Sequence, residues 1–177
     1  MRTAEDFYIL GLWLADGHWW SSSFGLTSSE LKLIKKFEKF LRRIAPDCSL
    51  KKKIYLPNKR NKGKKKAYRL YINNRALTRQ FLAYKKAKRL PIPRIYLPAY
   101  LAGRIDGDGS VDRKYRSGIR IAYGDKSDAE RDVLMFGKEN VSLYRYEAAK
   151  TWVIYLRKHF REKIVPKAKK YSIKLAP

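Results

Sequence analysis

The stretch Leu101–Gly109 (LAGRIDGDG), in the middle of the chain, has a near copy at Ile9–Gly17 (ILGLWLADG). Each stretch has an apolar residue, then Gly, four further residues, Asp and Gly. A single Asp-Gly pair that follows a helix is usually an ordinary turn. Because the whole pattern occurs twice with the same spacing, we interpret it as the motif of a duplicated fold that carries chemistry.

Small residues are spaced by four in both motifs. On a helix, Gly11 and Ala15 lie on one face, and so do Gly103 and Gly107. With no large side chain on that face, two helix backbones can approach closely, which is best known from membrane helices but has the same steric cause in water. We therefore predict that the two motif helices pack against each other.

Each motif ends in an aspartate followed by a glycine. Gly17 and Gly109 are predicted to end the helices in a left-handed turn, which places Asp16 and Asp108 at helix C-termini. The helix dipole disfavours an anion there by up to about 1 kcal/mol. If the helices pack in parallel, the two carboxylates also face each other, and such a site favours a divalent cation.

Further similarities follow the motifs in the same order in both halves. Two capping-box patterns, Thr27–Glu30 and Ser127–Glu130, are each predicted to open a helix. Two basic segments, Lys86–Arg89 and Lys167–Lys170, each follow a probable helix. The repetition predicts an α+β protein with two halves, each ordered as helix, two strands, helix, two strands and helix.

Apolar spacing places the elements of the first half. Residues at 31, 34, 37 and 41 are apolar and predict a helix that ends near residue 44. Alternating residues predict strands at 18–27, 49–56 and 67–73, and the first motif predicts a helix at 4–16. Prolines 91, 93 and 98 indicate a boundary near residue 92, so the predicted halves are residues 1–92 and 93–177.

Composition restricts the partner and the ligands. With 42 Lys plus Arg, 16 Asp plus Glu and a formal net charge of +26, the chain is expected to bind a polyanion. A hydrophobic share of 45% excludes a disordered basic tail.

One cysteine, Cys48, and two distant histidines do not supply a disulfide or a zinc site, so a metal would need oxygen ligands. No apolar run approaches the ~20 residues that span a bilayer, and we expect a soluble, intracellular protein with no membrane partner.

Leu101–Gly109 matches the LAGLIDADG signature at almost every position, and Ile9–Gly17 matches it more loosely. The chain thus resembles the single-chain, two-motif LAGLIDADG homing endonucleases. The resemblance implies two pseudo-symmetric αββαββα halves, antiparallel sheets that form a DNA-binding saddle, and motif helices packed at the interface. It also implies a monomer that cuts both strands of a long pseudo-palindromic DNA site, leaves short 3′ overhangs and serves intron homing.

The same resemblance assigns roles to residues. It implies metal-assisted hydrolysis with Mg²⁺ or Mn²⁺, whereas Ca²⁺ is expected to bind without supporting cleavage. The family keeps basic residues near its site, and the basic segments suggest lysines for this role, although these could equally be solvated surface lysines. The implied metal-binding and catalytic aspartates are Asp16 and Asp108, the additional ligands are the carbonyls of Ala15 and Gly107, and the candidate lysines are Lys86 and Lys167 or their neighbours Lys88 and Lys169.

Alternation along the strands predicts which side chains meet DNA. Basic, amide and aromatic residues on the open face of a twisted sheet suit the major groove, where Arg reads guanine and Asn reads adenine. The basic loop 59–66 is expected to contact phosphates. Trp19 and Trp20 are expected to pack beneath the sheet, with contact to DNA as the alternative. The predicted DNA-binding residues are Lys51, Lys53, Tyr55, Arg60, Lys62, Lys64, Lys65, Lys66, Arg69, Tyr71 and Asn73 in the first half, and Arg116, Arg120, Tyr144 and Tyr146 in the second.

Three other functions compete with cleavage. An RNA-binding intron maturase or splicing cofactor could share the fold and bind host intron RNA. A DNA-binding regulator could retain the fold without catalysis, and a ribosomal type of RNA protein would explain the charge but not the paired motifs. The presence of both Asp16 and Asp108 favours cleavage.

Overall fold

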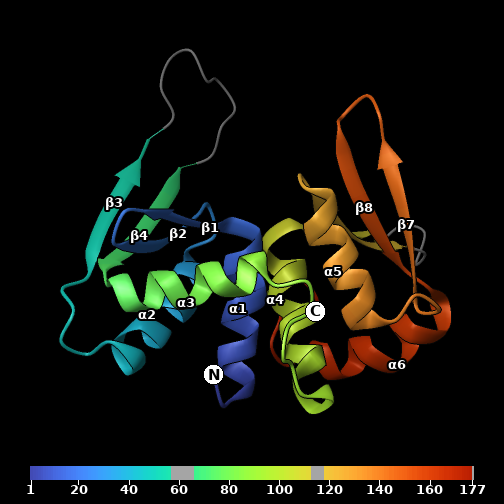
Figure 1. Ribbon diagram of the computed structural model, residues 1–177, viewed down its shortest axis with the longest axis horizontal. Coiled ribbons are helices and arrows are strands. Elements are labelled where there is room, and N and C mark those ends of the chain that lie inside the picture. The colour runs from blue at the N-terminus through green and yellow to red at the C-terminus, as the bar shows by residue number, and fades with distance from the viewer. Residues whose placement is uncertain (57–65, 113–117, 177) are drawn as a thin grey trace. The chain divides into compact units, whose positions relative to one another are not determined.

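The computed structural model describes residues 1–56, 66–112 and 118–176 and divides the chain into two compact units. One unit consists of residues 1–15 and 83–177, and the other of residues 16–82 (Figure 1). No helix among the described residues is long and apolar enough to cross a bilayer.

The same series of elements occurs twice along the chain, as predicted. The first series is α1 (Ala4–Asp16), β1 (Gly17–Trp20), β2 (Ser23–Ser28), α2 (Leu31–Ile44), β3 (Lys51–Tyr55), β4 (Ala67–Asn73) and α3 (Arg75–Lys86). After the short 3₁₀ helix η2 (Arg94–Tyr96), the second series is α4 (Leu97–Asp108), β5 (Gly109–Asp112), β6 (Gly118–Tyr123), α5 (Lys126–Phe136), β7 (Val141–Tyr146), β8 (Thr151–Leu156) and α6 (Lys158–Ala168). The predicted α+β class and αββαββα order are confirmed, and the boundary at residue 92 stays a prediction.

In the unit of residues 16–82, one antiparallel sheet has the strand order β1-β2-β4-β3. Helices α2 and α3 cover one face of this sheet (Figure 1). Between them lies an aromatic core in which the Phe24 ring is 5.6 Å from Phe37 and 4.5 Å from Phe81. The opposite face of the sheet is open.

The other unit contains an antiparallel sheet with the equivalent order β5-β6-β8-β7. Helix α4 packs on β6 and α6, and α5 packs on β6, β7 and β8. Ile121 and Ile154 are fully buried beneath these helices, with Tyr100 and Phe136 beside them. The two sheets therefore have the same topology, as expected for a duplicated fold.

Helices α1 and α4 run in the same direction (Figure 1), and their backbones approach each other at Gly11 and Gly103. A Cβ at Gly11 would overlap the carbonyl oxygen of Tyr100, and a Cβ at Gly103 would overlap that of Tyr8. The predicted close approach of the motif helices is confirmed. Tyr8 adds a hydrogen bond across the pair, because its hydroxyl donates to Asp106 Oδ2 at 2.7 Å.

The predicted left-handed turns after the motifs are wrong. Gly109 is extended, with φ −84° and ψ 152°, and begins β5, while Gly17 begins β1. Among the glycines that the structure describes, only Gly137 has a positive φ, of 91°. Gly109 is needed for space instead, since a Cβ there would lie 2.6 Å from the carbonyl oxygen of Ile105.

The predicted capping boxes are also displaced. Ser28 is the last residue of β2, so α2 begins only at Leu31, with Glu30 as an N-cap residue that makes no side-chain cap bond. Helix α5 begins at Lys126, because Asp125 is the N-cap and accepts a hydrogen bond from Ser127 N at 3.0 Å. Both helices occur where the apolar spacing and the capping patterns predicted a helix. Their N-cap residues, however, differ from the predicted ones.

Candidate functional site

Asp108 is the last residue of α4 and is half-buried. Burial, the largest cause, raises the pKa of its carboxyl above the ordinary value, and the charge of Asp128 adds to the rise. The positive charges of Arg104, Lys174 and Lys85 oppose it. Asp108 is therefore a carboxylate that lacks full solvation and is compensated by cations.

Arg104 lies one helical turn before Asp108 and is only 1% exposed. Its Nε is 2.9 Å from Asp132 Oδ2, an ion pair without good hydrogen-bond alignment, and its guanidinium lies 4.5 Å from the centre of the Tyr123 ring. Tyr100 and Tyr123 each donate a hydroxyl hydrogen bond to Asp132, at 2.6 and 2.9 Å. A fixed positive charge therefore lies inside the second motif, where the first motif has Leu12.

The other aspartate of the second motif, Asp106, is 2% exposed and holds the C-terminal segment. Its Oδ1 accepts hydrogen bonds from the Ser172 hydroxyl at 2.6 Å and from Lys174 N at 3.0 Å. Its Oδ2 accepts from the Tyr8 hydroxyl at 2.7 Å and from Ile173 N at 2.9 Å. All these partners are inside the protein, so Asp106 acts as a structural anchor.

This anchoring brings Lys174 to the C-terminal end of α4. The Lys174 ammonium donates to the carbonyl oxygens of Gly107 at 2.9 Å and Gly109 at 2.8 Å. Cations are favoured at helix C-termini because carbonyl groups there lack helical partners. Lys174 could not be predicted from sequence, because it lies in a tail with no periodicity and reaches α4 only through tertiary contacts.

The remaining predicted catalytic residues occupy different surroundings. Asp16 is the half-buried last residue of α1, directly after Ala15. Lys86, the last residue of α3, and Lys167, near the end of α6, are both exposed. The exposed positions of Lys88 and Lys169 are similar. The lysines whose charges act on Asp108 are instead Lys85 and Lys174.

The donors around Asp108 are hard oxygen atoms. A carboxylate and the Gly107 carbonyl suit Mg²⁺ or Mn²⁺ by their chemistry. The Gly107 oxygen, however, already accepts from the Lys174 ammonium. Among the residues that the structure describes, no cluster of three or more His, Cys, Asp and Glu side chains has the arrangement of a metal site.

The open face of the sheet in residues 16–82 carries a broad cleft of about 790 Å³. Strand register puts His18, Gly25, Tyr71 and Lys51 in one row across the sheet. The prediction that both tryptophans pack beneath the sheet is wrong, because Trp19 is 40% exposed, Trp20 is 80% exposed, and both line this cleft. The lining residues include the predicted Lys51, Lys53, Tyr55, Arg69, Tyr71 and Asn73, together with His18, Trp19 and Thr27.

Arg69 is held in place at the centre of this face. Its Nε donates to His18 Nε2 at 2.7 Å, its guanidinium lies 5.0 Å from the centre of the Tyr71 ring, and Nη1 donates to the Tyr55 hydroxyl at 3.4 Å. Burial and the charge of Arg69 lower the pKa of His18 to about 4. His18 is therefore neutral at pH 7 and has one unprotonated ring nitrogen. The hydrogen bond from Arg69 Nε identifies this nitrogen as Nε2. The supporting role of His18 was missed from the sequence.

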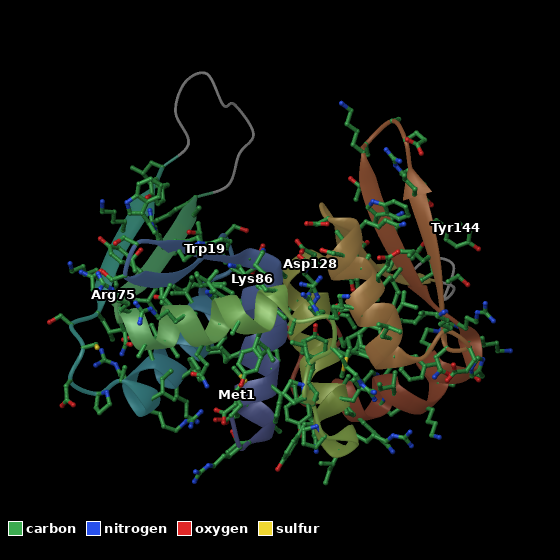
Figure 2. The ribbon with its side chains drawn as sticks, viewed as in Figure 1. Met1, Trp19, Arg75, Lys86, Asp128 and Tyr144 are labelled. Carbon is green, nitrogen blue, oxygen red and sulfur yellow. The ribbon has the colours of Figure 1, made fainter. Side chains whose placement is uncertain are left out.

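The second sheet presents an aromatic open face. Arg120 on β6 pairs across to Tyr155 on β8. The hydroxyls of Tyr146 and Tyr155 are 2.6 Å apart, and the Tyr144 ring meets the Tyr155 ring edge-on at 5.7 Å between centroids. Figure 2 shows Tyr144 on the exposed strand β7. A shallow cleft of about 630 Å³ lies beside these tyrosines and Arg157.

Some predicted DNA-binding residues lie outside the described residues. These are Arg60, Lys62, Lys64, Lys65 and Arg116. Lys66, which is described, lies just before β4, and its ammonium is 5.2 Å from the centre of the Tyr68 ring.

A comparison with family models matches the part of the chain that includes the first motif. Residues 4–86 match the family model described as a LAGLIDADG-like domain. A search of curated proteins gave no match.

Solved structures with a similar fold cover nearly the whole chain. The homing endonuclease I-DmoI, in complex with DNA and Ca, is 17% identical with a TM-score of 0.67 over 98% of this chain and 92% of that one. The homing endonuclease I-WcaI, bound to its DNA recognition sequence, is 13% identical with a TM-score of 0.65 over 96% and 82%. Full-length DUF199/WhiA from Thermatoga maritima is 13% identical with a TM-score of 0.62, over 99% of this chain and 58% of that one.

At these identities the structures show a shared fold, and the family model adds the match in sequence. The second motif, Leu101–Gly109, lies beyond the matched range but occupies the same place in the second series of elements. Residues 4–86 therefore match the LAGLIDADG-like domain in sequence, and nearly the whole chain has the fold of the solved homing endonucleases I-DmoI and I-WcaI.

Proposed function

We propose that the protein is a divalent-metal-dependent homing endonuclease. It cuts both strands of duplex DNA at one long pseudo-palindromic target and leaves short 3′ overhangs. The observation that carries this proposal is the pair of parallel motif helices, α1 and α4, which touch through Gly11 and Gly103 and each end in an aspartate. I-DmoI and I-WcaI, which share the fold, were solved with their DNA.

The open sheet faces supply the contacts to DNA. Arg69 is a fixed fork of donors of the kind that reads guanine in the major groove, and Asn73 at the end of β4 is suited to adenine. Lys51 and Lys53, exposed on β3, supply charge to phosphates. Because the net charge is +26, binding is expected to be strong and steeply dependent on salt.

Asp16 and Asp108 are the acidic residues of the reaction in this proposal, each with the carbonyl oxygen of the preceding residue, Ala15 or Gly107, beside it. A bound Mg²⁺ or Mn²⁺ supplies Lewis-acid activation of water and neutralises charge on the scissile phosphate. The raised pKa of Asp108 supports this role, because a partly desolvated carboxylate gains from a nearby cation. I-DmoI structures were solved with Mn, Ca and Mg.

The test is selection of cleaved molecules from a randomised duplex DNA library with Mg²⁺. The parent is compared with Asp16→Asn and Asp108→Asn, and Asp47→Asn, which changes an exposed carboxylate away from both motifs, serves as the matched control. We expect the parent and the control to cut one long target on both strands. Each motif variant is expected to lose this double-strand cleavage. Cleavage that survives in both motif variants would contradict the proposal.

RNA binding is the other informative outcome. If no duplex is cut while structured RNA binds tightly and in a salt-sensitive manner, the protein acts as an intron maturase that has kept the endonuclease fold. Measuring RNA affinity in the same preparation therefore distinguishes the two functions.

A further inference from the structure

The Lys174 side chain is built into the end of the second motif rather than resting on the surface. Its backbone N–H donates to Asp106, and the neighbouring Ser172 and Ile173 are fixed by the same carboxylate. From this anchored start, the ammonium reaches the Gly107 carbonyl at 2.9 Å. Three hydrogen bonds from the tail to a buried aspartate leave the tail little freedom to adopt another position.

The Lys174 ammonium donates to the carbonyl oxygen of Gly107, which in the proposed function is a ligand of the divalent cation. Gly107 precedes Asp108, and its carbonyl is the expected backbone ligand at this motif. An ammonium and a divalent cation repel each other strongly when they share one oxygen atom, since the repulsion scales with the product of their charges. The contact between Lys174 and Gly107 and an occupied cation site therefore exclude each other.

We propose that Lys174 is a built-in competitor for the cation site of the second motif. The inference rests on the proposed function for the identity of the cation. The Lys174 ammonium donates to the carbonyl of Gly107, and a divalent cation that binds at Asp108 would displace the ammonium from that oxygen. Lys174 thus makes the second motif the weaker of the two cation sites.

The sequence restricts this device to the second motif. The position of Asp106 is occupied in the first motif by Leu14, which is buried and apolar. A leucine side chain accepts no hydrogen bond, so it cannot hold a tail in the way that Asp106 does. The anchor that positions the competing lysine therefore depends on Asp106, which has an apolar counterpart, Leu14, in the first motif.

The test measures Mn²⁺ binding directly, from the free Mn²⁺ signal in electron paramagnetic resonance, with no DNA present. All proteins carry Asp16→Asn, which leaves Asp108 as the motif aspartate. Adding Lys174→Met removes the charge but keeps the apolar stem and the backbone N–H that Asp106 accepts. We expect this variant to bind Mn²⁺ about tenfold more tightly or better, because one positive charge is removed from beside a divalent ion.

Three controls make the result specific. Lys163→Met removes an equal charge from an exposed position on α6 and is expected to leave Mn²⁺ affinity unchanged. Lys174→Arg keeps the charge and the donors, so it should keep the weak affinity. Adding Asp108→Asn to the Lys174→Met protein should abolish the gain, which places the bound ion at the second motif.

The outcomes separate this inference from the proposed function. Unchanged or weaker binding after Lys174→Met, absence of binding in every variant, or a gain that persists with Asp108→Asn would each overturn the competitor role. Whether the protein cuts DNA is decided independently by the library selection. Cleavage by the parent together with unchanged Mn²⁺ affinity would leave the nuclease standing and remove only the role of Lys174.

Discussion

Arg69 differs from the other basic side chains of its sheet because its neighbours fix the plane of its guanidinium. His18 accepts from its Nε at 2.7 Å, and the Tyr71 ring lies 5.0 Å away. A donor pair that is already oriented loses less entropy when it meets the edge of a base. The expected contribution of Arg69 is therefore to sequence recognition more than to overall charge.

Arg69→Lys is expected to weaken binding to the selected target by roughly 1–3 kcal/mol, the range for a bidentate contact to a base. Non-specific duplex should bind almost as before, because the charge is kept. Competition binding at fixed salt measures both affinities. The control is Lys53→Arg, at the position paired with Arg69 on β3, which should change neither affinity much. Equal weakening on both DNAs would show that Arg69 contacts only phosphate.

Individual site residues were predictable from sequence where they belong to the repeated motif. Asp108 and Gly103 could be found because the repeated pattern marks them. The partner of Arg104 could not, because Asp132 lies on a different helix and approaches only after packing. Lys174 shows the same limit, since its contact with Gly107 spans 67 residues of sequence.

At the level of the elements, the contact between α1 and α4 depends on two glycines. Helical Gly normally costs about 1 kcal/mol relative to Ala, so replacing it at an open site stabilises a protein. Here a methyl group at Gly11 or Gly103 would overlap a carbonyl oxygen of the opposite helix. Close packing of backbones must therefore outweigh helix propensity at these positions.

Gly11→Ala and Gly103→Ala are each expected to lower the free energy of unfolding by about 1–3 kcal/mol, the usual cost of overpacking, despite the better helix propensity of alanine. Denaturant unfolding followed by circular dichroism measures the change. Gly124→Ala is the matched control, because a Cβ there meets nothing within 4 Å. A stabilising effect at Gly11 or Gly103 would mean that the helices do not pack this closely in solution.

The helices were predictable from apolar periodicity, and α1 and α2 have the predicted bounds. Their caps were not, because several polar residues near each start compete for the same role. Ser28 fits a capping pattern, yet it pairs with Tyr68 as the last residue of β2. The pairing of Ser28 with Tyr68 is a long-range interaction, and it outweighs the local tendency of Ser28 to cap a helix.

For the molecule as a whole, the dominant property is its charge of +26. Only charges that approach phosphates release counterions, so the salt dependence of binding reports which surface meets DNA. In the unit of residues 16–82 the two faces of the sheet can be compared directly. Lys51 and Lys53 lie on the open side, whereas Lys32 and Lys35 are exposed on α2, which covers the other side.

The double variant Lys51→Met, Lys53→Met is expected to reduce the slope of log K against log salt by roughly 2, close to one per lost phosphate contact. Titrations of duplex DNA at several salt concentrations give this slope. Lys32→Met, Lys35→Met removes the same charge from α2 and should leave the slope nearly unchanged. The reverse pattern would place the DNA on the helical side of the sheet.

The duplicated architecture was predictable because whole patterns recur along the sequence. The grouping of α1 with residues 83–177 was not, because it depends on glycine contacts that form only in three dimensions. Periodicity reports how one helix is built, whereas the choice of its partner is a property of the complete chain.

The pairing of α1 with α4 also has a consequence during biosynthesis. α1 leaves the ribosome before α4, with a nearly all-apolar surface from Phe7 to Leu14 that is buried in the finished protein. Its hydrogen-bond partner for Tyr8, Asp106, is translated 98 residues later. At about 5–20 residues per second, the nascent helix stays uncovered for several seconds while residues 16–82 are completed. During that interval α1 exposes an apolar surface of the kind that chaperones bind.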